Sequence, residues 1–303
     1  MPADQSTIQL GIVTASDGDT VMVAAGTYTG SGNKDIDFYG KSIYVVSETG
    51  YENTIIDCEH DGRGFYFHLT EDSTSILDGF TITNGNMGTG NGGGIYISAR
   101  TENGENNPLV VDNMIINNDV FGTGWSGKGG GVYLYGYGTV IISGNTISGN
   151  IGSSGGGIGS DAYNVTISGN TIENNKSGEY NFEGNFELRG EGGGISCGTP
   201  SHQILNNTIR GNQAVTGGGI KGNSSSTYIG NTIIGNTGGG LYQDSGGGTF
   251  SGNYVLSNTG GGVSIRGSVG VTDNIFEGNT GGALNYTLEN GAASISNNTI
   301  FNN

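Results

Sequence analysis

Pairs of asparagine residues, five positions apart, recur along the chain from residue 113 onward. The shortest intervals between successive pairs are 22 residues, from Asn231 to Asn253, and 21 residues, from Asn253 to Asn274. A period in this range indicates a repeat architecture, in which each unit packs only against its neighbours. The aligned pairs are Asn113/Asn118, Asn145/Asn150, Asn170/Asn175, Asn207/Asn212, Asn231/Asn236, Asn253/Asn258, Asn274/Asn279 and Asn298/Asn303.

Each repeat predicts three short β-strands. In one unit, "GGGVYLY" (129–135) opens the first strand, "TVIIS" (139–143) forms the second, and "TIS" (146–148) forms the third after a "GN" bend. Apolar and polar residues alternate with a period of two, which is the pattern of strands. Nothing between these strands has a helical period, so a sheet wrapped by crossover helices is excluded. The expected fold is a solenoid with three strands per coil and coils about 4.8 Å apart.

The asparagines and glycines have expected roles in this solenoid. Stacked asparagine side chains can hydrogen-bond from coil to coil as an interior ladder. We expect the ladder asparagines to adopt the left-handed conformation at a tight bend, and glycine to supply positive φ elsewhere. Two earlier copies are degenerate, with Asn53 and Cys58 in one and Gly79 and Asn84 in the other.

The whole chain, 1–303, is expected to form one domain. Ten first strands are predicted to begin at Ile36, Phe65, Ile95, Val132, Ile158, Ile195, Ile220, Leu241, Val263 and Leu284. Residues 1–30 should provide an N-terminal cap and a first strand, with Ser6 and Gln9 in a capping box and Ile8 and Ile12 on one helix face. The final "NNTIFNN" carries no capping signal, so we expect further domains beyond it.

Three segments resemble a known family. "IQLGIVTASDGDTVMVAAGTY" (8–28), "LDGFTITNG" (77–85) and the repeated "GGGIYIS" and "ISGNTI" motifs resemble the right-handed parallel β-helix proteins of the pectate-lyase-like superfamily and its secreted bacterial repeat proteins. The resemblance implies an extracellular or cell-surface protein that interacts with polysaccharide. If the protein is an enzyme, the resemblance implies a polysaccharide lyase or a glycoside hydrolase, and we expect a cation-assisted lyase that acts in a groove on the first-strand face. It also implies an alternative, a non-catalytic structural or adhesive stalk. The "DD" and "GHG" motifs of polygalacturonases and the arginine-rich motif of common pectate lyases are absent.

Charge and composition limit the classes of partner that the protein is expected to bind. The net charge is −17, from 27 acidic and 10 basic residues, which argues against a nucleic-acid partner. The sequence contains no apolar run of about 18 residues, so no membrane span is predicted, and "MPADQST" has no features of a leader peptide. Cys58 and Cys197 are expected to lie five coils apart, too far for a disulfide.

The outward face of the first strands is the predicted site. Tyrosine rings suit the apolar faces of sugars, and polar side chains suit their hydroxyl groups. The alternative is a tyrosine ladder that stacks only on itself for stability. The predicted substrate-binding residues are Tyr66, Tyr96, Tyr133, Tyr135, Tyr242, Arg266 and Arg189.

Lys221 is the predicted catalytic residue. A polysaccharide lyase needs a base to remove the proton next to a uronate carboxylate, and a cation to stabilise the resulting charge. Calcium is the expected cation, with Asp161, Asp244 and Glu187 as its predicted ligands. The alternative is a solvated surface lysine paired with Asp244, an arrangement that contributes little energy.

Overall fold

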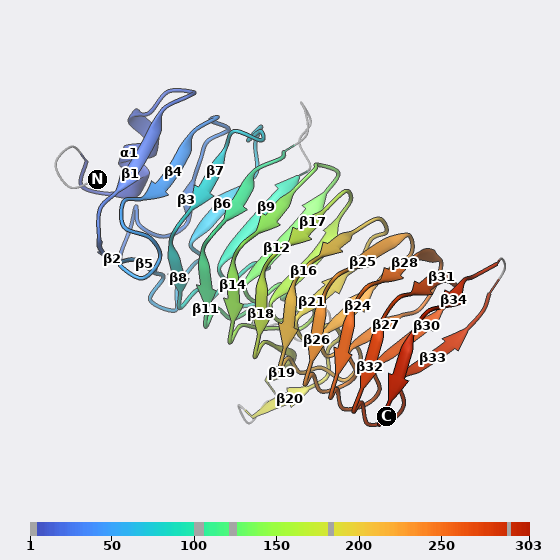
Figure 1. Ribbon diagram of the computed structural model, residues 1–303. Helices are drawn as coiled ribbons and strands as arrows, with labels where there is room; N and C mark the ends of the chain where they lie inside the picture. Colours follow the sequence, from blue (N-terminus) through green and yellow to red (C-terminus); the bar gives the residue numbers. More distant parts are fainter. Residues whose placement is uncertain (1–4, 100–105, 121–125, 181–184, 290–291) are drawn as a thin grey trace.

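The chain forms a right-handed parallel β-helix of three long sheets, shown by a computed structural model that describes residues 5–99, 106–120, 126–180, 185–289 and 292–303 (Figure 1). Sheet A contains β1 (Thr20–Val23), β4 (Tyr44–Ser47), β7 (Ile76–Asp78), β10 (Leu109–Val111), β13 (Ile141–Ser143), β17 (Thr166–Ser168), β22 (Gln203–Leu205), β25 (Ser226–Ile229), β28 (Gly247–Ser251), β31 (Ser268–Thr272) and β34 (Ile295–Ser296). Sheet B contains β2 (Gly26–Tyr28), β5 (Thr54–Asp57), β8 (Thr81–Thr83), β11 (Met114–Ile116), β14 (Thr146–Ser148), β18 (Thr171–Glu173), β23 (Thr208–Arg210), β26 (Thr232–Ile234), β29 (Tyr254–Leu256), β32 (Ile275–Glu277) and β35 (Thr299–Phe301).

Sheet C carries the predicted first strands. It contains β3 (Ile36–Asp37), β6 (Phe65–Phe67), β9 (Ile95–Ala99), β12 (Val132–Gly136), β16 (Ile158–Ala162), β21 (Ile195–Cys197), β24 (Ile220–Gly222), β27 (Leu241–Gln243), β30 (Val263–Arg266) and β33 (Leu284–Thr287). Each of the ten strands begins at the residue that the repeat predicted. The prediction succeeds because a run of three glycines marks the start of seven of these strands, and the alternating residues that follow fix which side chains face inward.

The core is a set of stacked apolar columns inside the coil. In sheet B, Ile147, Ile172, Ile209 and Ile233 are strand partners in successive coils, and all four are completely buried. Burial of one such side chain stabilises the fold by about 1.5 to 3 kcal/mol. Cys58 and Cys197 are buried in the same core as free thiols, as expected.

The two asparagine ladders run through the interior where the strands turn. Asn175 is typical: its Oδ1 accepts hydrogen bonds from the backbone N–H and the Nδ2 of Asn150, both at 3.0 Å. Its own Nδ2 donates to Asn212 Oδ1 at 3.0 Å and to the Ile147 carbonyl at 2.9 Å. Each amide therefore satisfies backbone groups of its neighbours at a bend that water cannot reach.

Two details of the expected ladder are wrong by one residue. The ladder asparagines, all of which lie in described segments, do not have positive φ; the residue before each one does, as at Gly144 (70°) and Asn174 (55°). That preceding residue makes the bend, which leaves the asparagine side chain free to point inward. In the coil before the first pair, Phe80 and Gly85 occupy the ladder positions, because their N–H groups donate to Asn113 and Asn118.

Helix α1 (Ile8–Thr14) covers the N-terminal end of the coil, with Ile8 and Ile12 completely buried. The expected capping box is wrong. Thr7 is the N-cap, and its hydroxyl accepts from the Leu10 N–H at 3.2 Å. The Gln9 amide instead pairs with both backbone groups of Asp37, each at 2.8 Å, and so closes the open edge of sheet C. No helix among the described residues is long and apolar enough to cross a bilayer.

Residues 176–191, one of two long insertions between repeats, contribute a β-hairpin at the side of the coil (Figure 1). Strands β19 (Lys176–Tyr180) and β20 (Phe186–Leu188) pair antiparallel, and β15 (Ile151–Gly152) pairs with β19 in parallel. The other long insertion, 119–128, lies partly outside the described residues.

Candidate functional site

The outward face of sheet C has two halves. The filled half is covered by stacked aromatic rings, and the hollow half contains two pockets. Strand register aligns one outward column, which consists of Tyr66, Tyr96, Tyr133, Gly159, Ser196, Lys221, Tyr242, Ser264 and Asn285. The column brings together five of the predicted site residues: Tyr66, Tyr96, Tyr133, Lys221 and Tyr242. The first three positions carry tyrosine rings, whereas the next three carry no aromatic ring.

The filled half is a continuous stack of aromatic rings. The ring centroids of Tyr66 and Tyr96 are 5.2 Å apart, and those of Tyr96 and Tyr133 are 5.3 Å apart. The guanidinium of Arg63 lies 5.1 and 5.0 Å from the centroids of the first two rings, and burial lowers the pKa of Arg63. His68 stacks on Tyr66 at 4.2 Å. Tyr133 is only 4 % exposed, so its ring has no open face for a sugar.

A pocket of about 210 Å³ opens directly after this stack, over β16, β21 and β24. Because Gly159 has no side chain, the outward column is interrupted there. The side chains that define this charged pocket are Lys128, Asp161, Glu191, Ser196, Lys221 and Asn223.

Asp161 is held from two sides. Its Oδ2 accepts a hydrogen bond from the Tyr133 hydroxyl at 2.7 Å and lies 2.6 Å from the Lys128 ammonium. Burial, and then this carboxylate, raise the pKa of Tyr133, so the phenol stays protonated. The carboxylate predicted to bind calcium is therefore already neutralised by a lysine.

Lys221 has looser contacts than Lys128. Its ammonium lies 3.9 Å from Glu191 Oε2, beyond hydrogen-bonding distance, and 5.4 Å from the centroid of the Tyr242 ring. Its side chain is 16 % exposed. The expected alternative pairing with Asp244 is not what the structure shows, because Asp244 accepts instead from the Tyr242 hydroxyl at 3.1 Å. Lys221, although less exposed than Lys128, is thus the more weakly paired cation of the two.

The three predicted calcium ligands lie in different places. Asp161 is in the charged pocket, Asp244 follows β27, and Glu187 is on the hairpin strand β20. Within the described segments, no three His, Cys, Asp or Glu side chains form a group that could hold a metal ion. Calcium binding stays a prediction without a located site.

The predicted arginines are already paired with acids. Arg189 lies 2.6 Å from Glu187 and 3.1 Å from Glu179 at the hairpin, and Arg266 lies 2.5 Å from Glu289. Both arginines are exposed, at about 60 % of their side-chain area. Tyr135 is the strand partner of Asp161, two residues along the strand from the Tyr133 column.

Sequence reasoning missed Lys128 and Glu191 as members of the pocket. A signal for them exists, because each directly precedes a run of three glycines. These positions align from coil to coil, so that Lys128, Ser154, Glu191 and Thr216 form a second column beside the first. The residue before the glycine run therefore faces the same groove as the outward strand residues.

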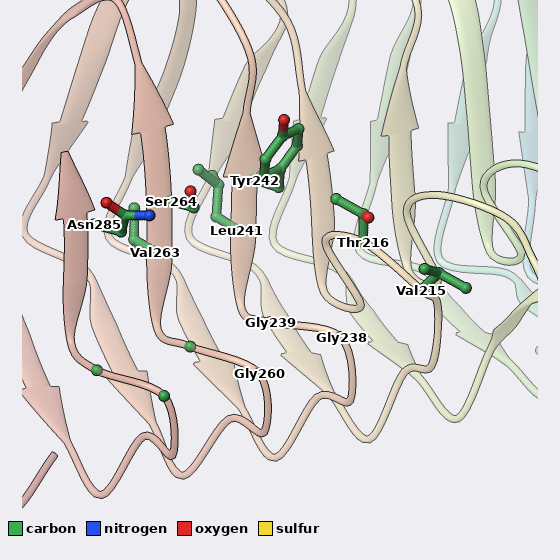
Figure 2. Close-up of a pocket in the computed structure, with 13 residues that line it drawn as sticks. Val215, Thr216, Gly238, Gly239, Leu241, Tyr242, Gly260, Val263, Ser264 and Asn285 are labelled. Atoms are coloured by element: carbon green, nitrogen blue, oxygen red, sulfur yellow. The ribbon is translucent and has the colours of Figure 1, made fainter. Parts of the chain in front are cut away.

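A second hollow, the glycine trough, has a volume of about 280 Å³ and lies beside β27, β30 and β33 (Figure 2). Figure 2 shows Tyr242, Ser264 and Asn285 on three successive strands, with Val215 and Thr216 on a neighbouring turn. The trough exists because the last turns are short. The start of β27 at residue 241 lies five residues after the ladder residue Asn236. The start of β24 at residue 220 lies eight residues after the ladder residue Asn212.

A comparison with protein families agrees with the coil over part of the chain. A family model described as "Right handed beta helix region" matches residues 177–300. A solved structure, the A-module of the Azotobacter vinelandii mannuronan C-5 epimerase AlgE6, is similar at 10 % identity with a TM-score of 0.45, covering 97 % of this chain and 93 % of that one. No curated protein sequence matches. The chain is a right-handed parallel β-helix repeat protein.

Proposed function

We propose that the protein binds a polysaccharide along the outer face of sheet C, outside the cell or at its surface. The observation that supports this most strongly is the hollow half of that face, where the charged pocket and the glycine trough follow one another along the coil axis. Concave sites that combine an aromatic ring with a few placed polar groups are typical of ligand binding. The filled half provides a rigid end to this groove.

Lys221 is the proposed contact for an acidic group of the polysaccharide. Lys128 is occupied by Asp161 at 2.6 Å, whereas Lys221 has no carboxylate within hydrogen-bonding distance among the described residues. An ammonium in this state can donate to a sugar carboxylate through a charge-assisted hydrogen bond. The net charge of −17 repels an acidic polymer at long range, so bound cations should assist its approach.

The proposal has a lytic form. In it, Lys221 would act as the base that removes the proton next to a uronate carboxylate, and a cation such as calcium, if one were bound, would supply positive charge at that carboxylate. The bond to the leaving sugar oxygen breaks, its electron pair stays on that oxygen, and the carbanion's pair forms the new carbon–carbon double bond. Solvent supplies the proton that the leaving oxygen takes up.

Incubation with a panel of acidic and neutral polysaccharides tests this, with calcium or with a chelator. New ultraviolet absorbance from unsaturated uronides supports the lytic form, and its loss in Lys221→Met assigns the base. Arg210→Met is the matched control, because Arg210 is an exposed, ion-paired cation on sheet B. Absorbance that is equal in wild type and Lys221→Met removes Lys221 from the reaction.

A structural or adhesive stalk is the second candidate. The stacked rings of the filled half and the two uninterrupted asparagine ladders favour it, because both make a stiff rod. Absence of both catalysis and binding across the panel would make this the leading function.

A further inference from the structure

We propose that the glycine trough binds uncharged sugar residues, so that the ligand of this face is a polysaccharide with both acidic and neutral residues. This inference rests on the proposed function and adds to it the sugar composition of the polysaccharide. The charged pocket takes the acidic residue, and the trough takes neutral residues further along the same chain.

The trough is kept open by backbone conformation. A Cβ placed on Gly261 would come no closer than 3.9 Å to the nearest atom, and one on Gly282 would meet nothing within 4 Å. Side chains at these positions would therefore project into free space. Their φ angles, +110° and +102°, are ones that only glycine adopts readily. The sequence thus holds the floor free of side chains in successive coils.

The polar groups of the trough are neutral and available. Thr216, Ser264 and Asn285 line it, and their side chains make no hydrogen bond to another described residue. Hydroxyl and amide groups can both donate to and accept from sugar hydroxyls. Among the residues that the structure describes, no charged side chain lines the trough, so a carboxylate placed there would lose its water without gaining a cation. This chemistry selects a neutral sugar.

Tyr242 links the two hollows. It lines the trough, while Lys221, whose ammonium lies 5.4 Å from the Tyr242 ring centroid, lines the charged pocket. The two residues are strand partners in adjacent coils. A polymer that lies across the strands would contact Lys221, then the Tyr242 ring, and then the trough.

Ser264→Tyr is the variant that tests the trough. It continues the tyrosine column from Tyr242, in the way that Tyr66 and Tyr96 stack at 5.2 Å, so the fold should tolerate it while the ring fills the trough. Thr249→Tyr, at an exposed position on sheet A, is the matched control. The probes are cellohexaose, mannohexaose and maltohexaose, with uronate hexamers in parallel, and affinity is measured by calorimetry with circular dichroism to check folding.

The expected result is that at least one neutral hexamer binds wild type and Thr249→Tyr equally, and binds Ser264→Tyr about tenfold or more weakly. If no neutral hexamer binds, or if Ser264→Tyr binds unchanged, the trough is not a sugar site. Uronate binding that depends on Lys221 would survive that result, and the proposed function with it. If wild type binds neither the neutral nor the acidic hexamers, both proposals are overturned together.

Discussion

The hydroxyl of Tyr133 donates a hydrogen bond to the carboxylate of Asp161 in the next coil, at 2.7 Å. This bond joins the two halves of the sheet C face, because Tyr133 is the last ring of the aromatic stack and Asp161 lines the charged pocket. Lys128 completes the arrangement from the insertion side at 2.6 Å. The stack therefore fixes one wall of the pocket.

Tyr133→Phe should destabilise the fold by about 1 to 2 kcal/mol, because a buried, charge-assisted hydrogen bond is lost while the ring remains. Tyr242→Phe is the matched control. Its hydroxyl donates to Asp244 at an exposed site, so its removal should cost no more than about 0.5 kcal/mol. Urea unfolding of the two variants measures the difference. Equal unfolding midpoints would mean that the Tyr133–Asp161 bond contributes nothing.

Asn175→Ala should destabilise the coil by about 2 to 3 kcal/mol. The substitution leaves the backbone N–H of Asn150 without its acceptor and removes donors from Asn212 Oδ1 and the Ile147 carbonyl, all in the buried interior. Asn285→Ala, at an exposed position, is the control and should be near neutral. Thermal and urea unfolding would measure the difference in stability between the two variants. Similar stability in both would contradict a structural role for the ladder.

Gly130→Ala should cost about 2 kcal/mol or more, because its Cβ would lie 2.3 Å from the Ile151 carbonyl oxygen and the backbone of the stacked coil must shift. Gly270→Ala is the comparison in a strand. Its Cβ would come no nearer than 4.0 Å to any other atom, so its effect should be small. Unfolding midpoints that fall equally in both variants would show that close coil packing does not explain the glycine runs.

His202 should make the fold sensitive to acid. It is completely buried, with Nε2 2.8 Å from Ser160 Oγ, and burial lowers its pKa to about 4. The folded state keeps it neutral, so its contribution is present above the unfolded pKa of about 6.5 and is lost as the pH falls toward 4. Complete loss of this contribution would lower the free energy of unfolding by on the order of 3 kcal/mol.

Asp119 acts with the opposite sign in the same pH range. Burial raises its pKa to about 6, so its protonation stabilises the folded state as the pH falls. The measurement is therefore a difference: the free energy of unfolding at pH 7 and at pH 5 for wild type and His202→Gln, both of which keep Asp119. We expect a smaller loss between pH 7 and pH 5 in His202→Gln than in wild type. Identical losses in the two proteins would show that His202 does not titrate with unfolding.

Much of the fold could be predicted because the same strand pattern recurs in successive coils of the chain. One strand pattern is ambiguous, but seven of the ten sheet C strands each follow a run of three glycines, and together they fix the register of the sheet. The details that failed are local. The residue before each ladder asparagine takes the left-handed bend, and Gln9 bonds to a strand edge rather than to its own helix. Both depend on where backbone groups lie in three dimensions, which residue spacing does not give.

The site was predicted in outline but not in its boundaries. Alternation places Lys221 and Asp161 on one face, and both line the charged pocket. Alternation does not show that Tyr133 is 4 % exposed, or that Lys128 reaches Asp161 from an insertion. The glycine trough was also missed, because a hollow is made by residues that lack side chains.

Binding of polysaccharide to the hollow half of the sheet C face can be measured directly. Binding isotherms for a panel of uronate oligosaccharides would be recorded with wild type, Lys221→Met and the control Arg210→Met. We expect at least one oligosaccharide to bind wild type and Arg210→Met equally and to bind Lys221→Met about tenfold or more weakly. Absence of binding across the panel, or equal binding by Lys221→Met, would contradict this expectation.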